Sequence, residues 1–424
     1  MTKKKKDDAK LNEASRTMEG CYGLVKTVEG VRRFLKTAFE LNREAEAKNR
    51  DRFTACVWGH AGIGKTTIIK DFAGEEVMWE GKKHNGRQVH DVPVAQFEEM
   101  GDLHGIPLDC VLMRNNGDEH WVAQKDEVVR AYRENGWSID TSVQPRTLMA
   151  PPPWVPDKPG PAILLLDDWN RASIRIIKGI MQLLQNYGMV SWKLPPGCNI
   201  VLTGNPDEQD YLVTTIDQAI ITRIKHVTLK EDASEWAIWA TGEGIDKRLI
   251  NWVLGYEEMM IGKERTNPRT LAEFGRYLTR VKSIEGERED VLMQAHALLD
   301  EETVAAMMVF FTRDMENIVE PEEILQGHEK AFKHIQDLMT KRKEARIDVV
   351  SITFERLFAH MVQPECKQTA GRIKNFQKCI TMDCVPEDMR HSICRRIARR
   401  REGAFNRWIV GDKKLKKLIM ETLH

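Results

Sequence analysis

The stretch that decides the fold is GHAGIGKTT, residues 59–67. It matches the phosphate-binding pattern G-x-x-x-x-G-K-[ST] in full. The apolar run just before it, Phe53–Trp58, is typical of a buried strand, and the pattern after it predicts a helix from about Lys65 to Asp71. Glycines allow backbone N–H groups to approach a phosphate closely, and the positive end of the new helix points at the same place. The sequence therefore predicts a nucleotide site between a strand and a helix.

Two residues of this motif have distinct chemical tasks. Lys65 can reach the β- and γ-phosphates of ATP, and the hydroxyl of Thr66 can ligate Mg²⁺. A glycine-rich turn also arises by chance, but here the flanking strand and helix supply the expected context. The predicted nucleotide-binding residues are Gly59, His60, Ala61, Gly62, Ile63, Gly64, Lys65, Thr66 and Thr67.

A second stretch, ILLLDDWNRA at residues 163–172, runs from four apolar residues directly into two carboxylates. The pattern predicts a strand over Ala162–Leu166 and a helix over Ser173–Asn186. In a chain that already has a phosphate-binding loop, a strand ending in an acid indicates the Walker B element. Asp167 would hold Mg²⁺, and Asp168 would polarise the attacking water. The structural alternative is a pair of solvated acids at a strand end.

Composition bounds the class of protein. A chain of 424 residues exceeds the usual single domain, so two or three domains are expected. The 64 basic and 64 acidic residues balance, so no overall field favours nucleic acid or anionic lipid. Eight cysteines without CxxC pairs suit a reducing cytoplasm. No apolar run approaches the roughly 18 residues of a membrane helix.

The organisation of the chain changes near residue 230. Before it, predicted strands alternate with predicted helices, which indicates an α/β domain with a parallel sheet covered on both faces. The segment 100–161 within it is expected to be loop-rich, with one helix over Gln124–Asn135. From about Glu231 onward the patterns predict helices only. The basic start MTKKKKDDAK has no apolar region behind it, so it predicts a disordered tail rather than a signal peptide.

Several further stretches resemble one family, the MoxR-type AAA+ ATPases with a helix-2 insert. The similar stretches are MGDLHGIP (100–107), APPPWVPDKPGPAILLLDDWNRA (150–172), IVLTGNPDEQDYLVTTIDQAIITRI (200–224) and NPRTLAEF (267–274). Together with the phosphate-binding loop they span about Cys21–Lys282 in the family's order. The resemblance implies a domain plan of a basic tail (1–20), an AAA+ α/β nucleotide-binding domain (21–230) and an AAA+ helical lid (231–288). The resemblance says little about residues 289–424, for which the sequence predicts a C-terminal helical domain.

The resemblance also implies residue roles. Asn205 would be sensor 1, which contacts the γ-phosphate or the lytic water; Arg223 would be the arginine finger of the adjacent subunit's site; and Arg269 would be sensor 2. A guanidinium suits the last two roles because it offers planar, permanent donors to the transferring phosphoryl group. A finger supplied in trans requires a ring, so the resemblance implies a hexameric ATPase that uses ATP and Mg²⁺ to remodel a protein client. A client with a von Willebrand factor A-type domain is part of that expectation.

One departure from the family leaves alternatives open. Asp168 stands where the family usually has Glu, and a carboxylate shorter by one methylene must act from a different distance. A slow ATPase, or an ATP-dependent scaffold that does not hydrolyse, is therefore one alternative. A nucleic-acid-directed motor is another, in which the basic cluster Arg395–Arg401 or the hairpin 186–197, with Trp192 and Lys193 at its tip, engages DNA or RNA.

Two weaker patterns stay undecided at this point. Asn170 either belongs to the family's own signature or caps the helix that begins near Ser173. A zinc site could be assembled in the C-terminal region, although core cysteines are commoner and the spacings fit none of the familiar zinc patterns. Its candidate ligands are Cys366, Cys379, Cys384, His391 and Cys394.

Overall fold

The computed structural model describes residues 21–206, 216–260, 263–313, 317–340, 346–399, 407–410 and 415. The chain divides into two compact units, Met1–Lys230 and Glu231–His424. The predicted tail, residues 1–20, lies outside the described residues.

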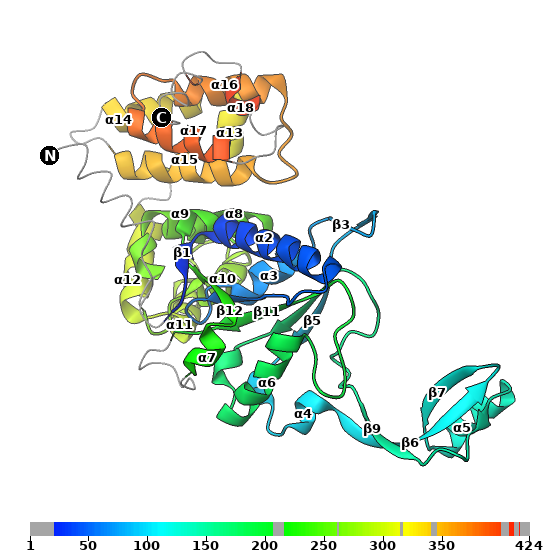
Figure 1. Cartoon of the computed structure of the whole chain (residues 1–424). Coiled ribbons are helices and arrows are strands. Elements are labelled where there is room, and N and C mark those ends of the chain that lie inside the picture. The colour runs from blue at the N-terminus through cyan, green and yellow to red at the C-terminus, as the bar shows by residue number, and fades with distance from the viewer. Residues whose placement is uncertain are drawn as a thin grey trace. The chain divides into compact units, whose positions relative to one another are not determined.

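The first unit is built on a six-stranded parallel sheet with the order β1-β12-β2-β11-β10-β5 (Figure 1). The strands are β1 (Leu24–Lys26), β2 (Thr54–Trp58), β5 (Gln88–Val92), β10 (Ala162–Leu166), β11 (Cys198–Gly204) and β12 (Ile224–Leu229). β2 and β10 are not neighbours, because β11 lies between them and pairs with both. The carboxyl ends of β2, β10 and β11 therefore meet at one edge of the sheet.

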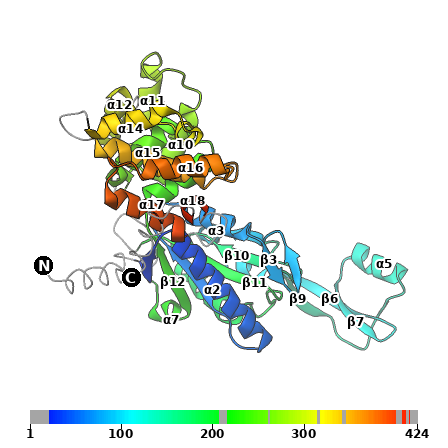
Figure 2. The same cartoon turned by 90° about the horizontal axis from the view of Figure 1, so that it is seen from above.

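Helices cover both faces of this sheet. They are α2 (Val28–Ala47), α3 (Lys65–Ala73), α4 (Gly101–His104), α6 (Ile174–Asn186) and α7 (Gln218–Ile221), with short 3₁₀ turns η1 (Val94–Gln96) and η2 (Trp169–Arg171). Side chains alternate along β2: Ala55 and Val57 pack with residues of α2 and α3, whereas Cys56 and Trp58 pack with residues of α6. Figure 2 shows α2 lying in front of strands β11 and β12. The predicted class, a parallel-sheet α/β core followed by helices, is confirmed.

The segment between β5 and β10 differs from its predicted loop. It forms a second, four-stranded antiparallel sheet, the inserted module, from β6 (Ile106–Asn115), β7 (Asp118–Ala123), β8 (Ser138–Ile139) and β9 (Arg146–Ala150), together with α5 (Asp126–Glu134). The module has a small core of its own: Val111, Met113, Val122 and Val129. The loop prediction was wrong because the hairpin signal was overlooked: Asn116 and Gly117 both have positive φ, as a tight β6–β7 turn requires. The predicted helix within the segment is present as α5. A further hairpin pairs β3 (Val77–Trp79) with β4 (Lys82–His84).

The second unit contains helices and no strand among its described residues. Its helices are α8 (Ala233–Gly242), α9 (Lys247–Gly255), η3 (Glu257–Met260), α10 (Pro268–Leu278), α11 (Arg288–Leu298), α12 (Glu301–Arg313), α13 (Pro321–Gln326), α14 (Glu329–Thr340), α15 (Ile347–Met361), α16 (Ala370–Ile380), α17 (Glu387–Arg399) and α18 (Arg407–Val410). One apolar core runs from Ala233 to Leu415. The predicted boundary between a lid and a C-terminal domain at 288/289 stays a prediction. None of the described helices has both the length and the apolar character of a membrane span.

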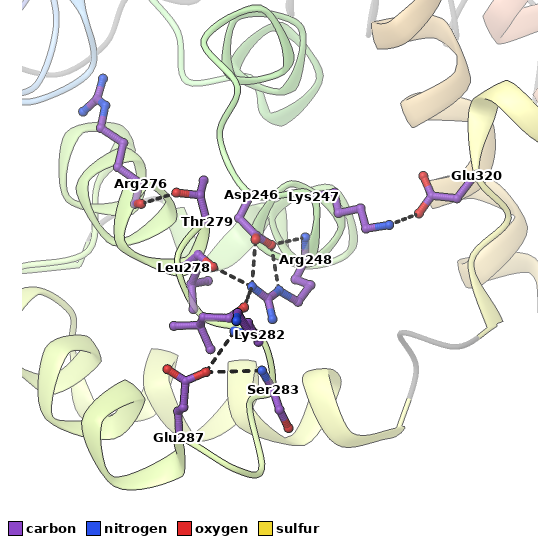
Figure 3. A network of polar contacts seen from close by, with 11 residues as sticks. Asp246, Lys247, Arg248, Arg276, Leu278, Thr279, Lys282, Ser283, Glu287 and Glu320 are labelled. Carbon is purple, nitrogen blue, oxygen red and sulfur yellow. Dashed lines mark hydrogen bonds and ion pairs between the residues drawn. The ribbon is translucent and has the colours of Figure 1, made fainter.

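A largely buried arginine fixes the helices at the start of this unit. Arg248 forms a two-pronged ion pair with Asp246, the N-cap of α9, and donates to the carbonyl oxygens of Leu278 at 2.6 Å and Val281 at 2.8 Å (Figure 3). These carbonyls belong to the end of α10 and the turn after it, where a cation is favoured by the helix dipole. Arg248 therefore holds α9 and α10 in one arrangement.

Candidate functional site

The phosphate-binding loop occupies the connection between β2 and α3. Gly62 and Gly64 have φ of 79° and 98°, a conformation that side-chain-bearing residues rarely adopt, and Gly64 is the N-cap of α3. The helix begins at Lys65, so its unpaired N–H groups face the loop. The strand–loop–helix context that the motif needs is present in full.

Lys65 lies inward at the centre of the site and is only 6% exposed. Its ammonium group donates to the carbonyl oxygens of Gly59 at 2.8 Å and His60 at 3.0 Å, and to Oδ1 of Asn205 at 2.9 Å. Burial lowers the pKa of Lys65 to about 8, and the two nearby Walker B carboxylates oppose that shift. A charged lysine is thus held by acceptors at the position where phosphates would bind.

Asp167 and Thr66 face each other across the sheet edge. The hydroxyl of Thr66 donates to Oδ1 of Asp167 at 2.9 Å, and the hydroxyl of Thr203 donates to the same oxygen at 2.5 Å. A hydroxyl and a carboxylate are hard oxygen donors of the kind Mg²⁺ takes when phosphates and waters complete its shell. The chemistry of Thr66 and Asp167, the predicted protein ligands, therefore fits a magnesium ion.

Asp168 is held next to Asn205 in an unusual backbone conformation. Its φ of 49° and ψ of 39° lie in the left-handed region, and its side chain is 38% exposed. Nδ2 of Asn205 donates to Oδ1 of Asp168 at 2.8 Å, and the backbone N–H of Asp168 donates to the hydroxyl of Thr203 at 2.9 Å. The Asn205 amide therefore orients the carboxylate and the Thr203 hydroxyl holds its backbone, while the carboxylate remains accessible to water.

Asn205 joins the two halves of the site. Its amide accepts from Lys65 and donates to Asp168, so one side chain spans the phosphate-binding loop and the Walker B acid. This is possible because β11, which ends at Gly204, lies between β2 and β10. The structure thus brings together five predicted residues: Lys65, Thr66, Asp167, Asp168 and Asn205.

Among the described residues, no hydrogen bond joins either predicted arginine to this cluster. Arg223 follows α7, is exposed, and folds back so that its guanidinium donates to the carbonyl oxygen of Ala219. Arg269 is exposed in the first turn of α10, and its backbone N–H is capped by Asn267 at 3.0 Å. An exposed arginine is free to reach another molecule, but no described contact assigns either residue its role.

Two predictions on other residues are corrected. Trp192 is only 7% exposed, because its indole donates to the carbonyl oxygen of Leu103 and its ring packs on Trp154. It is therefore not at the hairpin tip, where Val190 is 85% exposed instead. Asn170 does not cap α6, since Ser173 does so by accepting from the backbone N–H of Ile176.

Neither C-terminal alternative gains support from the described residues. No group of three or more His, Cys, Asp or Glu side chains is arranged there to hold a metal ion, and burial raises the pKa of the Cys379 thiol. Within the basic cluster, Arg396 pairs with Glu355 and covers the ring of Phe358, whereas residues 400–401 lie outside the described residues.

Sequence reasoning missed the aromatic cluster behind the site. Trp58 precedes the phosphate-binding loop and contacts Trp169, which follows Asp168, as well as Tyr22 and the ring of His226. The indole of Trp58 donates to Nδ1 of His226 at 3.0 Å, and Nε2 of His226 lies 2.8 Å from the carbonyl oxygen of Ile221 at the end of α7. The presence of tryptophans directly before and after the motifs was the available signal.

Comparisons with known proteins give fold-level matches only. No family model matches the sequence, and no curated protein matches it. Among solved structures the chain is similar to the RuvB Holliday junction branch migration motor of Thermotoga maritima, with 14% identity, a TM-score of 0.30, and coverage of 69% of this chain and 74% of that one. It is also similar to a predicted ATPase from Cytophaga hutchinsonii, with 11% identity, a TM-score of 0.31, and coverage of 84% and 86%.

Proposed function

We propose that this chain is an AAA+ ATPase of the MoxR type, which binds Mg·ATP at the Lys65 site and hydrolyses it. The proposal includes assembly into a ring, a hexamer by family resemblance, that remodels a protein client. A reducing cytoplasmic location belongs to it as well, because the eight cysteines, all among the described residues, form no disulfide.

The observation that carries the proposal is the contact set of Asn205. Its side chain links Lys65 of the phosphate-binding loop to Asp168. Beside this link, the hydroxyl of Thr66 donates a hydrogen bond to Oδ1 of Asp167. Phosphoryl transfer needs a cation near the phosphates, an ion bridge and an oriented water. Lys65, the Thr66–Asp167 pair and the accessible carboxylate of Asp168 would supply these three functions.

Bound Mg·ATP would bring the metal charge and the reactive phosphoryl group, and the chain's own residues would orient them. Lys65 would exchange its carbonyl partners for phosphate oxygens at the loop. Asp168 would accept a hydrogen bond from the attacking water, and Asn205 would hold that carboxylate in line. Because Asp168 is already positioned by a 2.8 Å bond, its short side chain is compatible with hydrolysis.

ATP hydrolysis with a matched pair of lysine variants tests the enzyme assignment. Lys65→Ala should abolish turnover, because it removes the buried ammonium of the loop. Lys70→Ala, in the same helix, removes only an exposed ion pair with Asp91 and should leave turnover within about twofold. Equal turnover of the wild-type and Lys65→Ala proteins would contradict the proposal.

The ring is tested by mixing two inactive variants. Arg223→Ala keeps its own nucleotide site, and Lys65→Ala keeps its arginine, so a mixed assembly contains some complete sites if the arginine acts on a neighbour. Part of the phosphate release should return on mixing, with protein concentration and Mg·ATP held constant. If Arg223→Ala alone retains wild-type turnover, Arg223 is not the finger.

A protein client is distinguished from nucleic acid by capture. Asp168→Asn keeps the acceptor for the Asn205 amide but loses the base, so it should bind ATP and retain its partner. Co-elution of a protein, including one with a von Willebrand factor A-type domain, would support remodelling. Salt-sensitive stimulation of turnover by DNA or RNA would support the motor alternative instead. ATP-driven assembly with no phosphate release would select the scaffold.

A further inference from the structure

Asn170 makes a reciprocal pair with the backbone of Asn205. Its Nδ2 donates to the carbonyl oxygen of Asn205 at 2.8 Å, and its Oδ1 accepts from the Asn205 backbone N–H at 3.1 Å. The two residues are 1% and 0% exposed. One amide therefore satisfies both backbone groups of the residue that follows β11, away from competing water.

This pair fixes the backbone from which the Asn205 side chain extends. The Asn205 side chain makes hydrogen bonds of 2.9 Å with Lys65 Nζ and 2.8 Å with Asp168 Oδ1. A small shift of the Asn205 backbone would therefore break one or both of these bonds. Asn170 itself is fixed because it lies within η2, directly after Trp169, which is fully buried, and Asp168 is the N-cap of this turn. A displacement of catalytic groups by about 1 Å can cost about 100-fold in rate.

We propose that Asn170 is a positioning residue for hydrolysis, which acts through Asn205 and touches neither nucleotide nor metal. The inference rests on the proposed function, since it concerns the same site. It assigns Asn170 a task distinct from helix capping, because Ser173 performs the capping of α6. It also predicts that the effect of removing Asn170 depends on whether Asn205 is present.

The chain supplies a matched control for a buried reciprocal pair. Asn42, which is 2% exposed, donates from Nδ2 to the carbonyl oxygen of Phe53 at 2.8 Å and accepts from the Phe53 backbone N–H at 2.7 Å. Phe53 precedes β2, at the end of that strand opposite the phosphate-binding loop. The Asn42 amide also donates to the Tyr187 hydroxyl at 3.1 Å and to Oδ1 of Asn199 at 2.9 Å. Asn42→Ala therefore removes the same kind of reciprocal pair, together with these two bonds, at the end of β2 opposite the loop.

A double-mutant cycle tests the inference with full-length protein. We expect Asn170→Ala to lower kcat about 10- to 100-fold with KM for ATP within about threefold, as for a lost orienting contact. Asn205→Ala should lower kcat at least as much, and the double variant should equal Asn205→Ala alone. Asn42→Ala should lower the thermal midpoint at least as much as Asn170→Ala, because it removes two further hydrogen bonds, but should keep kcat within about twofold.

The outcomes separate this inference from the proposed function. If the kcat losses of Asn170→Ala and Asn205→Ala multiply in the double variant, or if Asn170→Ala keeps wild-type kcat, Asn170 does not act through Asn205. Should Asn170→Ala not fold, Asn170→Asp keeps the acceptor and loses the donor; wild-type kcat in that variant overturns the inference, and an intermediate kcat supports it. Wild-type protein without Lys65-dependent turnover instead overturns the proposed function.

Discussion

At the scale of single residues, the site is organised by groups that carry no motif. Thr203 is fully buried and serves both Walker B acids: its hydroxyl donates to Asp167 and accepts from the backbone N–H of Asp168. Motif patterns predict Lys65 and Asp167 because the chemistry of phosphate binding fixes those residue types and their spacing. They could not identify Thr203 or Asn170, whose partners are set by the neighbouring strand rather than by nearby sequence.

Thr203→Val should therefore impair the site more than the fold. Valine keeps the shape but leaves the Asp168 N–H without its acceptor, so we expect turnover to fall about 10- to 100-fold. The free energy of unfolding should fall by about 1–2 kcal/mol. Thr228→Val is the control, since Thr228 is equally buried and bonds only to the carbonyl oxygen of Tyr22. Steady-state kinetics and chemical denaturation of both variants measure the difference.

His226 gives the first unit a dependence on pH. Burial lowers its pKa from 6.5, and the carbonyl of Ile221 only partly opposes the shift. Nδ1 accepts from the Trp58 indole, so protonation would place two donors face to face. The unfolded chain therefore binds a proton at His226 more readily than the folded chain does. The contribution of neutral His226 to the free energy of unfolding is complete above about pH 7 and is lost as the pH falls through the pKa of the folded state.

We therefore expect the unfolding free energy to decrease on acidification from pH 7.5 to 5.5. In His226→Gln the decrease should be smaller, because the titrating group is gone. Denaturation midpoints for both proteins across this range provide the measurement. Parallel curves would show that His226 has the same pKa in the folded and unfolded states.

At the scale of elements, the strands and helices next to the motifs followed from the sequence. The predicted strand Ala162–Leu166 is β10, and the predicted helix at Ser173–Asn186 is α6 with Ser173 as its cap. Five consecutive buried residues in β10 produce an apolar run that turn residues delimit clearly. The inserted module was missed because its strands mix polar with apolar residues, unlike the uniformly apolar β10, and because the Asn116-Gly117 turn between β6 and β7 was overlooked.

The contacts of Arg248 with Asp246, Leu278 and Val281 give a prediction about helices α9 and α10. Arg248→Ala removes the bonds to two helix-end carbonyls and leaves the largely buried Asp246 without its ion pair, so the free energy of unfolding should fall by about 2–4 kcal/mol. Arg276→Ala, in α10 itself, removes a 3.8 Å pair with Glu273 whose partners are 52% and 65% exposed. That variant should change stability by less than about 0.5 kcal/mol. Equal denaturation midpoints for the two variants would contradict a stabilising role for Arg248.

At the scale of the whole molecule, the division after Lys230 makes each unit a candidate folding unit. The residues of the Lys65 cluster all lie before this point, and one apolar core serves the described residues after it. A fragment of residues 21–230 should therefore show a higher thermal midpoint with Mg·ATP, because ligand binding stabilises the folded state. A fragment of residues 231–424 should unfold cooperatively with helical circular dichroism and show no such shift. Absence of a cooperative transition in either fragment would show that the units depend on each other.

The left-handed backbone at Asp168 bears on how this site could be altered. Aspartate tolerates that conformation because its short side chain can bond locally, whereas longer side chains gain no such compensation. Lengthening the carboxylate to the Glu of the resembling family would thus not be a simple repair. Asp168→Glu should lower the thermal midpoint and, by pushing the carboxylate past the Asn205 amide, should not raise phosphate release. The identity of this acid is then a consequence of the turn that carries it, and an enzyme engineer seeking faster turnover would have to rebuild that turn first.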